Sequence, residues 1–286
     1  MIYPANFESK IGFDRIRALV AERCNTQAAV AKLDEHRFSS RHAEVERRIA
    51  SADEMRTIVM MESEFPNEEF CDLTNLIAKV RVEGTFLDLE EAVLLARALH
   101  QVDSVSRFIL SRERALYPQL YKLTEGVISL EAIANHIDSL IDRFGQMRDS
   151  ASDELYRIRR SIREREGQAS KRLLQVLQAA KSAGIVEADA TLSIRDGRAV
   201  IPVAAGNKRK LNGFVQGESA TGKTVFIEPV EVVELNNELR ELEYAERREI
   251  VRILCELTDR IRPEIDTVEA SADYLATIDM LRAKGR

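Results

Sequence analysis

Tryptophan is absent from this 286-residue chain, and cysteine, glycine and proline are scarce, at 3, 12 and 6 residues. Cys24, Cys71 and Cys255 are far apart in the sequence, so they form neither a CxxC metal motif nor a disulfide framework. The four histidines show no ligand-like spacing either. No apolar run reaches the roughly 18 residues that a transmembrane helix needs, and the N-terminus lacks a signal-peptide pattern. These absences predict a reduced, soluble, cytoplasmic protein.

Ala, Leu, Glu, Arg and Ile dominate what is present. Most of these side chains lose little rotamer freedom in a helix, so the composition favours α-helix over strand. The net charge of −6 opposes nucleic-acid binding by the chain as a whole. A mean charge hides local patches, however, and the distribution of charge along the chain decides the matter.

Apolar residues at helical spacing predict that residues 1–140 form an all-helical core domain without a catalytic site. One helix is expected from Asn6, a candidate N-cap, and a second from Ser40 to about Glu64. Asp88 and Glu91 have the spacing of a capping box, which predicts a helix from there to about Arg114.

Two long helices are predicted further along, over residues 150–183 and 230–261, each spanning roughly 50 Å. Gly184 ends the first helix, and Pro229 suits the first turn of the second. The first is rich in Arg and the second in Glu, as expected for an antiparallel pair, although two solvated charged faces would give the same pattern.

Between these helices, at 190–228, the apolar period changes from 3.6 to two, which predicts a small β island. Asp196-Gly197 between alternating runs indicates a hairpin with a type I′ turn. Phe214–Gln216 and Thr224–Ile227 indicate a second pair of strands. The predicted fold is therefore mainly α. It has a helical core (1–140), an ascending lever helix (141–188), an antiparallel β clamp at the lever tip (189–229) and a descending helix that returns to the core (230–286).

The segment Gly217–Thr224 fits the phosphate-loop pattern GxxxxGK[ST] at every position. A phosphate loop requires a helix that begins at the lysine and directs its N-terminal dipole at the anion. Here Lys223 is followed by Thr-Val-Phe-Ile-Glu-Pro, a β-branched, alternating run that ends in proline. The surroundings predict a turn between two strands, and an NTPase that uses 217–224 stays as an alternative.

The β island has a local excess of positive charge, since residues 189–223 carry six basic side chains against Asp189, Asp196 and Glu218. Long cationic side chains in turns can reach phosphate groups, which gives affinity without sequence specificity. The predicted nucleic-acid-binding residues are Arg195, Arg198, Lys208, Arg209, Lys210 and Lys223. A solvated basic loop, or a helical scaffold that dimerises without nucleic acid, are the alternatives.

Several segments together resemble one family, the bacterial MutS paralogues that carry a C-terminal Smr nuclease domain. The most specific are Asp196–Val203, Ser219–Gly222 with Thr224–Pro229, and Glu234–Leu239. The opening Phe7–Leu19, Asp149–Leu155 and the closing Asp279–Lys284 also match. In that family the loop reads Ser-Ala-Ser-Gly-x-Thr, so Lys223 falls at a variable position and the phosphate-loop match is an accident.

The resemblance implies a helical core, a lever of two antiparallel helices and a β clamp, followed by an ATPase domain. This chain stops at Arg286, where the ATPase would begin. We therefore expect no enzyme activity and no cofactor in this chain, with ATP and Mg²⁺ bound by the parent protein. The resemblance further implies a parent homodimer and action on branched or double-stranded DNA, in suppression of recombination, or on stalled ribosomes through ribosomal RNA. Mismatch reading is not expected.

Overall fold

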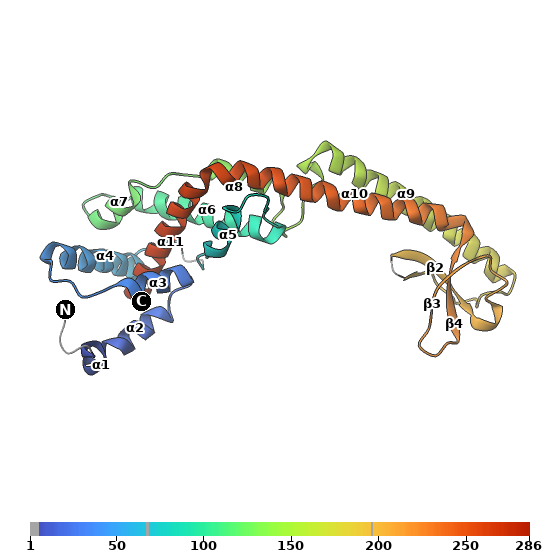
Figure 1. The fold of residues 1–286 in the computed structure, drawn as a ribbon, viewed down its shortest axis with the longest axis horizontal. Coiled ribbons are helices and arrows are strands. Elements are labelled where there is room, and N and C mark those ends of the chain that lie inside the picture. Colours follow the sequence, from blue (N-terminus) through green and yellow to red (C-terminus); the bar gives the residue numbers. More distant parts are fainter. Residues whose placement is uncertain (1–5, 67–68, 196) are drawn as a thin grey trace. The chain divides into compact units, whose positions relative to one another are not determined.

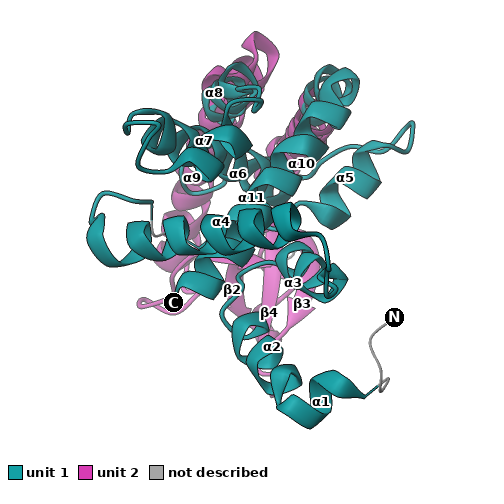
Figure 2. Ribbon diagram, turned by 90° about the vertical axis from the view of Figure 1, so that its left-hand side faces the viewer, with its two compact units in different colours: residues 1–148, 254–286 teal, residues 149–253 magenta. Residues whose placement is uncertain are grey.

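The computed structural model describes residues 6–66, 69–195 and 197–286. The chain is mainly α-helical with one small antiparallel sheet, which confirms the predicted fold class (Figure 1). It divides into two units: unit 1 comprises residues 1–148 and 254–286, and unit 2 comprises residues 149–253 (Figure 2). The finer division into core, lever and clamp segments stays a prediction. No helix among the described residues has the length and apolar character needed to cross a membrane.

Unit 1 consists of helices connected by short loops. Their bounds are α1 Phe7–Ile11, α2 Phe13–Ala21, α3 Gln27–Glu35, α4 His42–Met61, α5 Thr74–Val80, α6 Leu89–Leu110, α7 Pro118–Thr124, α8 Glu131–Leu140 and α11 Ile265–Gly285, with the 3₁₀ turn η3 at Arg262–Glu264. The capping box predicted at Asp88 is present: its side chain accepts from the Glu91 N–H, and the Glu91 side chain accepts from the Asp88 N–H. Asn6 occupies the predicted N-cap position of α1, but its side chain makes no capping hydrogen bond.

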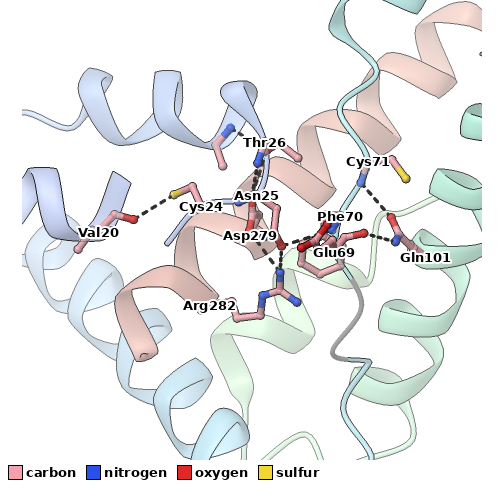
Figure 3. A network of polar contacts seen from close by, with 11 residues as sticks. Val20, Cys24, Asn25, Thr26, Glu69, Phe70, Cys71, Gln101, Asp279 and Arg282 are labelled. Atoms are coloured by element: carbon pink, nitrogen blue, oxygen red, sulfur yellow. Dashed lines mark hydrogen bonds and ion pairs between the residues drawn. The ribbon is translucent and has the colours of Figure 1, made fainter. Parts of the chain in front are cut away.

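Helix α11 is the centre of unit 1, because it contacts α2, α3, α4, α5 and α6. Nearly every residue from Tyr274 to Ala283 is buried, including the polar Asp279 and Arg282. A helix that is buried on all sides must satisfy its polar groups internally. Asp279 accepts from the N–H groups of Asn25 and Thr26, at 2.8 and 2.9 Å, at the start of α3 (Figure 3).

Arg282 completes this polar network. Its guanidinium donates to the side-chain oxygen of Asn25 and lies over the ring of Phe70, with 4.2 Å from Cζ to the ring centroid (Figure 3). Asn25 in turn accepts from the N–H of Phe70. The network therefore holds the end of α11 against both the start of α3 and the segment before α5.

Unit 2 contains two long helices, α9 Asp153–Ser182 and α10 Val230–Ile261. The residues of α10 from Leu254 onward belong to unit 1. The 3₁₀ turn η1 at Asp149–Ala151 precedes α9. Ser152 caps α9 by accepting from the Leu155 N–H, and Gly184, with φ of 66°, follows its C-terminus as predicted. Helix α10 begins at Val230, directly after Pro229 as predicted, but Pro229 is the last residue of β4 rather than part of the first turn of the helix.

Side-chain bonds show that α9 and α10 run antiparallel, as their charges predict. Ser152 donates to Glu249, Arg159 to Glu246 at 2.6 Å, and Arg165 is 2.9 Å from Glu238, so residue numbers rise on α9 as they fall on α10. The Arg159 guanidinium also bonds Asp149, at 2.7 Å.

The four predicted strands are present: β1 Ser193–Arg195, β2 Arg198–Ala204, β3 Gly213–Glu218 and β4 Thr224–Pro229, with the 3₁₀ turn η2 at Ala205–Asn207. They form an antiparallel sheet in the order β1-β2-β4-β3. Asp196 of the predicted type I′ turn lies outside the described residues. Its neighbour Gly197 has a φ of 75°, in the left-handed region that favours glycine.

One face of the sheet packs on the helices where α9 ends and α10 begins. Its core consists of Leu173, Leu177, Ala180, Val186, Ile201, Val203, Val225, Ile227 and Val232. Period-two alternation puts Ile201, Val203, Val225 and Ile227 on the same face, because Ile201 pairs with Ile227 and Val203 with Val225. The paired helices thus hold the sheet and its turns in place.

Candidate nucleic-acid interface

The structure separates the six predicted nucleic-acid-binding residues into two groups. Arg195 and Arg198 flank the turn at the start of β2, whereas Lys223 directly precedes β4 at the other end of the β2–β4 pair. The backbone N–H of Ala205 donates to the Lys223 carbonyl, at 2.9 Å, so the turn η2, which leads into Lys208–Lys210, begins at that second end.

Lys208, Arg209, Lys210 and Lys223 are exposed. No carboxylate of the described chain lies within 4.0 Å of their cationic groups. Their pairing status differs from that of most cations on α9, since Arg157, Arg159, Arg160, Arg163 and Arg165 all have acidic partners. Cations without a local partner keep their full charge for a ligand, which favours these four as phosphate contacts.

Arg195 is also exposed, and its guanidinium lies 4.1 Å from the centroid of the Phe226 ring. This cation–π contact fixes the side chain against the sheet but leaves its charge unneutralised. Two further exposed cations, Lys171 and Arg172, precede the buried Leu173 on α9. They are absent from the predicted site because their sequence pattern matches that of any solvated helix face.

Arg198 differs from the others because its guanidinium is bonded inside the fold. Its Nη1 lies 2.7 and 2.9 Å from the two carboxylate oxygens of Glu228, and its Nη2 donates to Asn237 at 2.9 Å. The Arg198 side chain is 18% exposed and that of Glu228 is 1% exposed. The Arg198 charge is neutralised within the fold, which leaves the other predicted cations as candidate phosphate contacts.

Glu228 is the centre of a polar network that the sequence did not predict. Besides Arg198, its carboxylate accepts from Gln216 at 2.5 Å and from Asn236 at 2.7 Å. A buried carboxylate needs such donors, since leaving it unpaired would be strongly destabilising. Arg198, Glu228, Asn236 and Asn237 all lie in the motifs that carry the family resemblance, which was the available signal for this network.

The phosphate-loop pattern at 217–224 forms a β-hairpin turn. Ser219 and Thr224 pair through Ser219 N–H and the Thr224 carbonyl, at 2.8 Å, and strand β4 begins at Thr224. The N–H groups of Gly222 and Thr224 donate to the carbonyl and hydroxyl of Ser219. A phosphate loop needs a helix after the lysine, and here strand β4 follows Lys223 instead. This geometry does not support the alternative of an NTPase that uses the segment.

The surface described here offers cations and backbone but no metal site: in the described part of the chain, no group of three or more His, Cys, Asp or Glu side chains could hold an ion. Its chemistry is that of anion binding. Phosphate groups along a nucleic-acid backbone match exposed, unpaired Lys and Arg side chains in adjacent turns.

Comparison with models of known protein families finds no match. Curated proteins named endonuclease MutS2, in contrast, match nearly the whole chain. Those of Gemmatimonas aurantiaca and Geobacillus sp. (strain WCH70) are 31% and 30% identical over 96% of this chain, covering 34% and 35% of their own length. That of Lacticaseibacillus paracasei is 35% identical over 71% of this chain and 26% of its own length. The two relatives that match 96% of this chain are about three times as long, so the chain spans about a third of their length. The chain thus belongs to the MutS2 family.

Proposed function

We propose that unit 2 binds nucleic acid through its small sheet, in a sequence-independent way, as part of a MutS2-type protein that acts on branched DNA. The observation that carries this proposal is the set of exposed cations without acidic partners in two adjoining turns, Lys208–Lys210 and Lys223. The relatives are named endonucleases, a class whose substrate is nucleic acid. For the parent protein, the same proposal includes an ATPase domain, assembly as a homodimer and any action on ribosomal RNA.

The decisive experiment replaces Lys208, Arg209 and Lys210 together by Ala and measures affinity for a four-way DNA junction between 50 and 200 mM salt. Each phosphate contact contributes about 0.9 to the slope of log K against log salt. Loss of three contacts therefore lowers the slope by about 2.7, so wild-type affinity falls roughly 40-fold more than that of the variant over this fourfold range of salt.

A matched control carries the same charge change in unit 1, with Arg23, Arg97 and Arg107 replaced by Ala. These three side chains are exposed and have no carboxylate partner among the described residues. The control should keep the wild-type slope. Equal slopes for the wild type, the control and the sheet variant would refute the proposed interface, and junction and ribosomal-RNA ligands compared side by side would show which one the chain prefers.

A further inference from the structure

A cavity of about 370 Å³ lies in unit 1, between α1, α2, α3, α4 and the end of α11. Part of its wall is apolar, with Phe13, Ile16 and Phe38 among the residues that line it. The Phe13 and Phe38 rings are in contact, with centroids 5.8 Å apart, and 47% of Phe38 is exposed. Volumes of this order accommodate small ligands, and partly exposed aromatic rings offer a stacking surface.

The lining of the cavity also carries several cations, and Arg17 lies next to the apolar residues, with its Cζ 5.4 Å from the centroid of the Phe13 ring. Arg17, Arg37, Arg48 and Lys284 line the cavity, against the single carboxylate of Glu8. A second cavity of about 310 Å³ shares His36, Arg48 and Lys284 with the first, so these three side chains lie where the two adjoin.

Lys284 is the half-buried cation in this cluster that lacks an acidic partner. Arg37 is exposed and has no acidic partner among the described residues either, but it donates to the backbone carbonyl of Asp34. Arg17 is bonded to Glu8 and Arg48 to Glu44, and both also donate to backbone carbonyls. The Lys284 ammonium instead lies 2.9 Å from the His36 ring nitrogen Nδ1. No carboxylate in the described ranges lies within 4.0 Å of it. Because the ammonium has three N–H donors, two are left for a ligand.

Burial, together with the neighbouring positive charges, lowers the pKa of both groups. Burial, then the charges of Arg48 and Arg17, lower the pKa of Lys284 to about 8. Burial and the neighbouring cations, Lys284 first, lower the pKa of His36 to about 4, so His36 is neutral at pH 7. A half-buried ammonium in a cationic setting gains stability from an anion that enters the cavity.

We propose that this cavity binds a nucleoside monophosphate, with its phosphate on Lys284 and its base against Phe13, Ile16 and Phe38. A monophosphate joins the two properties that the cavity combines, since its dianion suits the surplus of cations and its planar base suits the aromatic wall. The polar network of Asp279 and Arg282 fixes α11 against the start of α3, so Lys284 and His36 are held in place before the ligand arrives (Figure 3).

The test is calorimetric titration of the 286-residue chain with AMP, CMP, adenosine and inorganic phosphate at pH 7. We expect saturable binding of at least one nucleotide, at least tenfold tighter than the nucleoside or phosphate alone. Lys284→Met, which removes the charge and relieves repulsion, should weaken nucleotide binding at least tenfold. Phe13→Ala should weaken the nucleotide without changing the affinity for phosphate.

The matched control is Arg15→Gln, which removes an exposed cation from the same helix as Arg17, outside the cavity lining. It should bind nucleotide like the wild type. The proposal would be overturned if AMP and CMP both bind no more tightly than phosphate. It would also be overturned if the Lys284→Met variant binds nucleotide like the wild type.

The dependence on pH gives a second readout. With a pKa of about 8 for Lys284 in the free protein, only about a tenth of the ammonium remains at pH 9, so nucleotide affinity should fall up to tenfold between pH 7 and pH 9. Lys284→Met should remove this dependence. The other charged or titratable groups near the cavity are Glu8, Arg17, Cys24, Lys32, His36, Arg37, Glu44, Arg48, Asp279 and Arg282. Of these, His36, with a pKa of about 4, and Cys24, whose pKa is raised to about 11 mainly by burial, stay neutral over this range.

Discussion

Replacing Arg198 by Met should destabilise the sheet of unit 2 far more than it affects nucleic-acid binding. The substitution leaves Glu228, which is 1% exposed, with two neutral amide donors and no cation. Removing one partner of a buried ion pair costs about 3–5 kcal/mol, and the 18% exposure of Arg198 favours the lower end of that range. A loss of about 3 kcal/mol corresponds to a roughly 100-fold larger equilibrium constant for local opening, and so to about 100-fold faster hydrogen exchange.

Hydrogen exchange measured by mass spectrometry can detect this change, with peptides from β2 and β4 as the readout and α6 as an internal reference. Adding Glu228→Gln to Arg198→Met removes the orphaned charge, so the double variant should recover about half of the loss. Lys210→Met, which removes an exposed cation with no acidic partner among the described residues, is the control and should change exchange less than about twofold. Unchanged exchange of β2 and β4 in Arg198→Met, or a double variant no more protected than the single one, would refute the structural role of this pair.

Three further outcomes are expected. Gly213→Ala should loosen the β3–β4 pairing by about 1–3 kcal/mol in urea unfolding, because its Cβ would lie 2.3 Å from the Glu228 carbonyl oxygen; wild-type stability would contradict this. Hydrogen bonding from Arg252 lowers the pKa of Glu249 below 4.5 in the folded chain, so its stabilisation is present above pH 4.5 and is lost as the pH falls through the folded value. Glu249→Gln should therefore flatten the acid limb of stability measured against pH, and an unchanged limb would count against it. Lys223→Ala should leave any heat of ATP binding unchanged in calorimetry, and a loss of saturable binding would reinstate the phosphate loop.

The helices and strands were predictable because their signals are local. The Asp88–Glu91 capping box, Gly184 after α9 and the alternation in β2 and β4 each act over a few residues. The position of Pro229 at the end of β4, rather than in the first turn of α10, has the same origin, since proline fits both a strand end and a helix start.

The candidate site was predictable only in part, because partners distant in sequence decide which cations are available. Arg198 resembles Lys208 in the sequence, yet its partner Glu228 stands thirty positions away in the chain and becomes a neighbour only through the β2–β4 pairing. The cavity in unit 1 depends even more on residues that are distant in the sequence. It joins His36 to Lys284, and no periodicity or spacing links the two ends of the chain.

The antiparallel bonds between α9 and α10 limit how the length of this protein can change during evolution. Each bond joins a residue of one helix to a fixed counterpart on the other: Ser152 to Glu249, Arg159 to Glu246 and Arg165 to Glu238. An insertion in α9 alone would displace every later counterpart and rotate its buried face away from α10. Length should therefore vary in matched steps of about seven residues in both helices, the spacing that restores a helical face after two turns. A chimaera with one such step removed from each helix should keep its sheet folded, whereas a deletion in only one helix should not.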